Sequence, residues 1–121
     1  MSKSDTNKWL EEVVELSLLY DFYGELLSDN AKRVFEGYVL EDMSLSELSE
    51  ETGISRQGIY DNVSRSVNKL RTYEDKLKLV EKFENMKREV DEIKTLAEES
   101  RKGKDETEKI VRIAEHMLES Y

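Results

Sequence analysis

Apolar residues recur at intervals of three and four along most of this chain, which is the spacing of side chains on one face of an α-helix. The first such run, over residues 8–27, predicts a helix with a broad apolar stripe, and Asp5 or Thr6 is expected to cap its start. The polar residues 28–30 end this helix and supply capping oxygens for a second one, which is expected over residues 29–42.

A short helix and a tight turn are predicted next. Ser44 and Glu47 have the spacing of a capping box, which opens a helix over residues 45–51. Gly53 can adopt the left-handed conformation that closes a helix, and Ser55 is placed to cap the helix that follows. Two helices joined by a three-residue turn that contains glycine are typical of a helix-turn-helix.

The second helix of this motif has an apolar face and a polar face. Ile59, Val63, Val67 and Leu70 share one side at helical spacing and are expected in the core. The exposed side is predicted to carry eight candidate DNA-binding residues: Ser55, Arg56, Gln57, Tyr60, Asp61, Ser64, Arg65 and Lys69.

No residue directly after Leu70 predicts a stop, so this helix is expected to continue as far as Ala97. The apolar heptad is interrupted only over residues 80–86, where two successive intervals of three resemble a stammer. The polar stretch 98–106 predicts a break, and a last amphipathic helix follows over residues 107–121. That helix can fold back as a helical hairpin, or both helices can serve a second subunit, and the sequence does not choose between these two arrangements.

Composition limits the class of protein. The chain has 121 residues, 39% of them charged, with a single histidine and no cysteine, which argues against a zinc site and a thiol nucleophile. No phosphate-binding glycine loop or nucleophile motif occurs, so we expect no enzyme activity, no cofactor and no metal. The N-terminus lacks the features of a signal peptide and no apolar run is long enough for a membrane span, which favours a cytoplasmic protein without membrane insertion.

We therefore expect an all-α protein with a helix-turn-helix domain over residues 5–72 and a helical arm over residues 73–121. The formal charge of -9 opposes contact with DNA unless one face is locally basic. Residues 55–71 hold four basic side chains against the single acidic Asp61, whereas residues 41–51 hold five acidic side chains and no basic one. About three phosphate contacts would give a salt slope near -3, so one copy would bind weakly, and a homo-oligomer formed through the arm would double the contacts.

The runs LYDFYGELLS, LEDMSLSELSEETGISRQGIYDNVSRSVNKL and YEDKL, in this order, resemble the YlxM-type bacterial proteins. That family has a helix-turn-helix similar to region four of sigma factors, without a wing. The resemblance implies a DNA-binding or regulatory protein. It also implies a part in the signal recognition particle pathway, because the genes of the family tend to lie beside those of the targeting GTPase and its receptor.

Two functions remain open. In the first, the second helix of the motif reads double-stranded DNA: Arg56 and Gln57 contact bases, Ser55 and Tyr60 contact phosphate, and Arg65 and Lys69 bind the flanking backbone. In the second, the same exposed helix contacts protein, and the chain regulates the targeting GTPase or its receptor without binding DNA. Because the net charge of the chain is negative, the sequence does not choose between these two functions.

Overall fold

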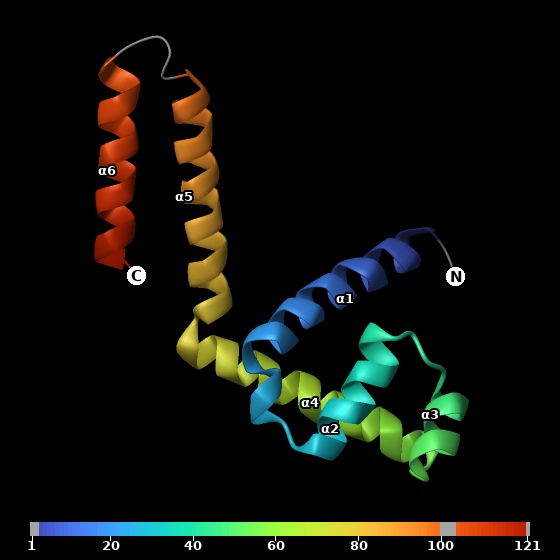
Figure 1. The fold of residues 1–121 in the computed structure, drawn as a ribbon. Helices are drawn as coiled ribbons and strands as arrows, with labels where there is room; N and C mark the ends of the chain where they lie inside the picture. The colour runs from blue at the N-terminus through green and yellow to red at the C-terminus, as the bar shows by residue number, and fades with distance from the viewer. Residues whose placement is uncertain (1–2, 100–103, 121) are drawn as a thin grey trace. The chain divides into compact units, whose positions relative to one another are not determined.

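The computed structural model describes residues 3–99 and 104–120, and every element in these ranges is helical (Figure 1). The chain divides into two compact units, Met1–Lys78 and Leu79–Tyr121. The prediction of an all-α protein with a helix-turn-helix is confirmed.

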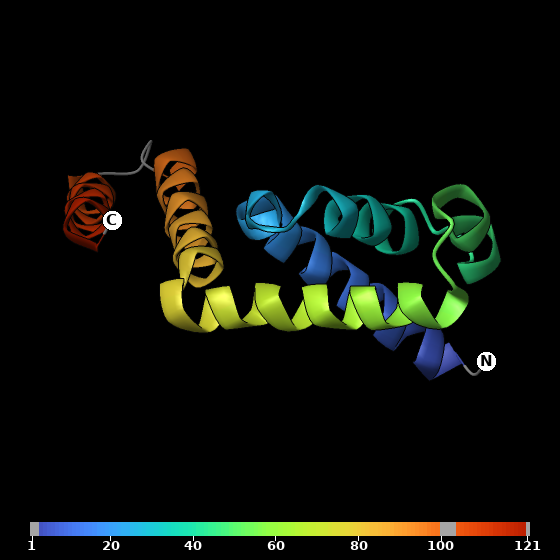
Figure 2. The same ribbon diagram turned by 90° about the horizontal axis from the view of Figure 1, so that it is seen from below.

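The first unit is assembled on one long helix, α4 (Arg56–Leu77). The helices α1 (Lys3–Tyr23), α2 (Asp29–Phe35) and α3 (Leu45–Thr52) all pack on it, as Figure 2 shows from below. Side chains from all four helices and from the segments between them close the core, and the largest that are fully buried are Tyr23, Val34, Phe35, Leu48, Ile59 and Leu70. Burial of these apolar side chains is the main term that stabilises the unit.

The first helix differs from its predicted bounds. Because α1 includes Asp5 and Thr6, neither residue is its N-cap, and that prediction is wrong. The helix also ends at Tyr23 rather than at Leu27, and a short 3-10 turn, η1 (Gly24–Leu26), follows it. The predicted cap of the second helix is confirmed, since the Ser28 hydroxyl accepts a hydrogen bond of 3.2 Å from the amide of Ala31.

Aromatic side chains of α1 fix this helix to its neighbours. The ring of Tyr20 stacks on Phe35 of α2 with 4.8 Å between centroids, and its hydroxyl donates to the Glu36 carboxylate at 2.5 Å. The buried Tyr23 donates to the carboxylate of Glu74 on α4, also at 2.5 Å. Core packing of these rings agrees with the apolar stripe predicted for the first helix.

The second predicted helix contains a π segment, η2 (Glu36–Leu40), directly after α2. The wider turn is closed by the Glu41 amide, which donates to the Glu36 carbonyl at 2.9 Å. Within it the buried Gly37 lies against α3: a Cβ added there would lie 2.5 Å from Cδ2 of Leu48. The close approach of α3 to this segment therefore requires glycine.

The continuous helix predicted to extend to Ala97 is broken at Lys78, and that prediction is wrong. Lys78 has φ 57°, in the left-handed region, and its amide donates to the Glu74 carbonyl to close α4. A new helix, α5 (Leu79–Glu99), begins at once. Lysine is not a typical residue for this conformation, so the local sequence did not predict a helix break at Lys78. The apolar residues of α5 that are less exposed near its start are Val80, Phe83 and Met86, which keep the two successive intervals of three that the sequence showed.

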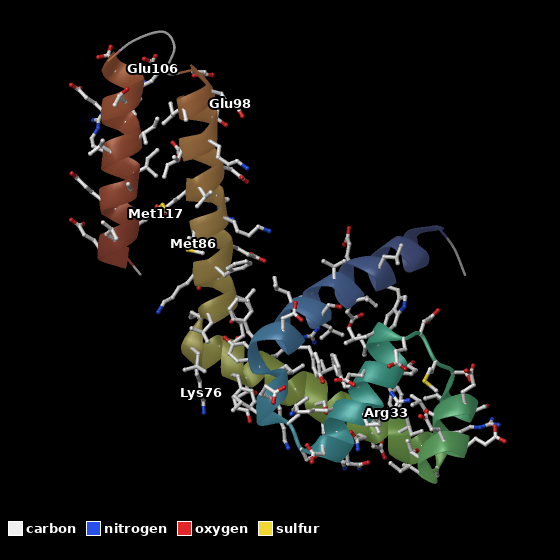
Figure 3. All side chains as sticks on the ribbon, viewed as in Figure 1. Arg33, Lys76, Met86, Glu98, Glu106 and Met117 are labelled. Carbon is white, nitrogen blue, oxygen red and sulfur yellow. The ribbon has the colours of Figure 1, made fainter. Side chains whose placement is uncertain are left out.

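The second unit is a helical hairpin of α5 and α6 (Lys104–Ser120), which pack against each other. This arrangement is one of the two that the sequence left open. Figure 3 shows Met86 of α5 and Met117 of α6 pointing toward one another between the helices. Glu89 and His116 set the register, since the carboxylate lies 3.2 Å from Nδ1 of the ring. The predicted break over residues 98–106 falls partly outside the described residues.

Candidate functional site

The helix-turn-helix comprises α3, a three-residue turn and α4. Gly53 has φ 75°, a left-handed conformation that L side chains rarely adopt, and its amide donates to the Ser49 carbonyl at 2.9 Å. The hydroxyls of Ser44 and Ser55 cap α3 and α4, accepting from the amides of Glu47 and Gly58 at 3.1 and 3.0 Å. All three local signals in the sequence are thus confirmed, and they set the direction in which α4 leaves the turn.

The N-terminal half of α4 presents a polar face. Of the predicted site residues, the structure places seven in exposed positions: Ser55, Arg56, Gln57, Tyr60, Asp61, Arg65 and Lys69. Ser64 is half-buried and lines a groove beside the helix. The opposite face carries the predicted core residues, of which Ile59, Val63 and Leu70 are buried. The helix therefore has the division of faces that its sequence pattern predicts.

Pairing of charges changes the electrostatics expected from the sequence. Arg71 turns toward α1, with its guanidinium 3.7 Å from the carboxylate of Glu12 and 3.8 Å from that of Glu15. Within the described part of the chain, the exposed cations Arg56, Arg65 and Lys69 form no ion pair. Of the four cations in residues 55–71, three are therefore free to meet a ligand.

The acidic α3 is partly neutralised by a residue of α2. The guanidinium of Arg33 lies 2.6 Å from the Glu51 carboxylate and 3.4 Å from that of Glu41 (Figure 3 labels Arg33). The hydrogen bond to Glu51 raises the pKa of Arg33, and the bond to Glu41 adds to this effect. Glu47 and Glu50 stay exposed on α3, so the first helix of the motif still repels phosphate.

A largely apolar groove of about 440 Å³ adjoins the polar face of α4. Trp9 of α1 and Tyr38 of the π segment meet edge to face in it, with 6.4 Å between ring centroids, and Tyr60 of α4 lies at its side. The exposed fractions of Trp9 and Tyr60 are 37% and 55%. The sequence pattern placed Trp9 in the apolar stripe of the first helix, which was expected to face the core. Helical periodicity shows which face of a helix is apolar, but it does not show whether a residue on that face is buried or lines a groove.

The charged side chains that line the groove are acidic. Glu12 lines the part near α4, and Asp42 and Glu47 line a continuation of it that also includes Trp9 and Tyr38. No basic residue is among those that line either part in the described chain. Apolar rings with carboxylates at the edge suit a cationic partner with apolar anchors.

The described residues contain no group of three or more histidine, cysteine, aspartate or glutamate side chains that could hold a metal ion. Among the described helices, none is long and apolar enough to cross a membrane.

Comparisons with known proteins agree with the helix-turn-helix. Residues 10–113 match the UPF0122 family, described as "Putative helix-turn-helix protein, YlxM / p13 like". A UPF0122 protein of Caldanaerobacter subterraneus subsp. tengcongensis is 46% identical over 84 residues, which are 69% of this chain and 72% of that protein. A UPF0122 protein of Bacillus thuringiensis is 37% identical over 108 residues, which are 89% of this chain and 98% of that protein.

Proposed function

Because the chain belongs to the UPF0122 family of YlxM/p13-like helix-turn-helix proteins, we propose that it is a regulatory protein that binds double-stranded DNA through α4. One observation carries this proposal. Arg56, Arg65 and Lys69 are exposed on α4 without ion-pair partners, whereas Arg33 of α2 and Arg71, further along α4, are held by carboxylates.

The residues of α4 have distinct roles in this proposal. Arg56 and Gln57, in the first turn, face base edges in the major groove, where arginine pairs with guanine and glutamine with adenine. Ser55 and Tyr60 donate hydroxyl hydrogens to phosphate, and Arg65 and Lys69 bind the backbone further along the groove. Asp61 and Ser64 lie on the same side of the helix and complete the surface.

Salt dependence tests the phosphate contacts. The chain should bind mixed duplex DNA at low salt with a slope near -3, since about three phosphates are neutralised. The double variant Arg65→Gln/Lys69→Gln should reduce the slope by about two. Lys32→Gln is the matched control, because Lys32 is a cation of α2 that already pairs with Glu25 at 2.9 Å. Absence of binding by the wild-type chain at low salt would overturn the proposal.

Selection from a random DNA pool tests base reading. Arg56→Ala together with Gln57→Ala should abolish the sequence preference, since both groups that reach base edges are removed, and helical content should not change. If the double variant selects the same sites as the wild-type chain, the assignment of Arg56 and Gln57 is wrong.

The groove favours a second function, contact with a protein partner. In this proposal the apolar rings of Trp9, Tyr38 and Tyr60 receive a basic amphipathic segment of the signal recognition particle GTPase or its receptor, the partners that the family resemblance implies. Trp9 is the chain's only tryptophan, so its fluorescence should change directly when the groove is filled.

A substitution of Trp9 distinguishes the two proposed functions. Trp9→Ala should prevent co-purification of the GTPase under nuclease treatment and leave DNA binding by α4 unchanged, because Trp9 lies on α1, outside the proposed DNA-binding surface. Retention of the partner by Trp9→Ala would exclude the groove as its binding site.

A further inference from the structure

The α5–α6 hairpin leaves its apolar residues incompletely covered. Between residues 79 and 119, no side chain that the structure describes is fully buried. Val90, Val111 and Leu118 are exposed by 40%, 49% and 83%. Two helices alone bury too little apolar surface to form a stable core. The hairpin therefore resembles two helices of a four-helix bundle without the other two.

The uncovered residues of the two helices lie on one face of the hairpin. At about 100° per residue, Val90 lies about a quarter turn from the seam formed by Met86, Glu89 and Ile93. Val111 and Leu118 lie about a third of a turn, in the same rotational sense, from the seam residues of α6, which are Ile110, Ile113 and Met117. Because the two helices of a hairpin are antiparallel, offsets in the same rotational sense along the chain point to the same side.

Opposite charges border this apolar face on its two outer edges. Lys87 and Lys94 follow the edge on α5, and Glu108 and Glu115 follow the edge on α6; all four are exposed. None of them forms an ion pair within the described residues. A surface with an apolar centre, one basic edge and one acidic edge is complementary to itself after a twofold rotation.

We propose that this face binds a second copy of the chain and that the two hairpins form a four-helix bundle. The twofold axis runs parallel to the helices, so that α5 of each copy packs against α6 of the other and all neighbouring helices are antiparallel. The alternative pairing of α5 with α5 would place the basic edges together.

The register of the hairpin places complementary residues at matching heights. Counted from the Glu89–His116 pair, Val90 lies between the levels of Val111 and Leu118 of the other copy. Lys94 and Glu108 differ in level by three residues, as do Lys87 and Glu115, which is about 4.5 Å along the axis. Long side chains span this offset, so both ion pairs can form at each of the two equivalent edges.

Sedimentation of the full chain tests the bundle. The wild-type chain should sediment with the mass of two chains, and Val111→Glu/Leu118→Glu should sediment as a monomer because the substitutions place charges in the apolar face. Helical content by circular dichroism should be retained in the variant, since both residues are already largely exposed in the hairpin. A monomeric wild-type chain, or a variant that stays dimeric, would overturn the proposal.

Charge reversal tests whether α5 of one copy packs against α6 of the other. The measurement is made without DNA, so its outcome is independent of the DNA proposal. Lys87→Glu/Lys94→Glu should weaken dimerisation by more than about tenfold, and adding Glu108→Lys/Glu115→Lys should restore it. Glu92→Lys/Arg112→Glu on the opposite face is the matched control and should leave dimerisation unchanged. Failure of the second pair of substitutions to rescue the first would exclude the α5-to-α6 pairing. A dimer that binds no DNA would overturn the DNA proposal alone.

Discussion

The side-chain amide of Gln57 donates a hydrogen bond of 3.0 Å to the Asp61 carboxylate, one turn further along α4. This bond holds Gln57 on the helix surface and places a negative charge in the middle of the proposed DNA-binding face. Base contact by Gln57 must therefore compete with an existing partner, and phosphate must approach a carboxylate.

Removal of the Asp61 carboxylate should strengthen DNA binding. We expect Asp61→Asn to lower the dissociation constant for duplex DNA by about threefold to tenfold, because relief of about 1 kcal/mol of repulsion at a surface has this size. Fluorescence anisotropy at low salt measures the effect. Asp75→Asn makes the same change of charge near the other end of α4, beyond a Debye length, and should have little effect. Equal or weaker binding by Asp61→Asn would count against α4 as the DNA-binding surface.

Alkaline pH should destabilise the first unit through Tyr20. Burial raises the pKa of Tyr20 above its usual 10.0, and the hydrogen bond to Glu36 and the charge of that carboxylate raise it further. A raised pKa in the folded state means that the contribution to stability is complete below pH 10.0 and is lost as pH rises above it. Urea unfolding followed by circular dichroism should show this loss.

Tyr20→Phe separates this effect from general alkaline unfolding. The variant should cost about 1 kcal/mol at neutral pH, where the hydrogen bond to Glu36 is lost, and its stability should decline less steeply above pH 10.0. Tyr60→Phe, at an exposed position, is the control. An unchanged slope in Tyr20→Phe would show that Tyr20 does not dominate the alkaline transition.

Gly37→Ala should destabilise the helix-turn-helix by about 1–3 kcal/mol, the usual cost of overpacking a core. The new methyl group would meet Cδ2 of Leu48, a side chain with no exposed surface and therefore no room to move. Thermal unfolding gives the free-energy change. Gly24→Ala is a useful comparison, because the nearest atoms there belong to the ring of the half-buried Tyr20. A neutral Gly37→Ala would mean that α3 does not approach the π segment this closely.

Lys78→Gly should leave the chain as stable as the wild type or more stable by up to about 1 kcal/mol, because glycine adopts the left-handed conformation without steric cost. In an uninterrupted helix the same change would cost about 1 kcal/mol. The sign of the change in thermal stability therefore distinguishes a helix break at Lys78 from a continuous helix. Lys76→Gly, inside the last turn of α4, is the control and should be destabilising.

Local signals in the sequence were sufficient to predict the turn of the helix-turn-helix and the apolar and polar faces of α4. Ser44, Gly53 and Ser55 act through backbone groups within four residues, so their positions alone predict the caps and the turn. Buried Ile59 and Leu70 follow from helical periodicity in the same way. The fold of the motif is therefore determined by short-range chemistry.

The features that the sequence did not predict depend on tertiary contacts or on an atypical residue. Arg71 was counted among the cations available to DNA, but its partners Glu12 and Glu15 lie on α1, far away in the sequence. Trp9 became part of a groove only because Tyr38 and α4 stop short of covering it. Lys78 ends a helix without the glycine or asparagine that usually marks such a position.

The π segment Glu36–Leu40 also restricts where residues can be inserted or deleted in related chains. A π turn closes five residues on, where an α turn closes four residues on, so it accommodates one more residue in the same helix. Deletion of a single residue there would restore a regular α turn, and it would rotate every preceding side chain of α2 by about 100° relative to α3. Val34 and Phe35 would then leave the core. We therefore expect insertions and deletions among relatives to avoid this segment and to gather in the connection between α5 and α6.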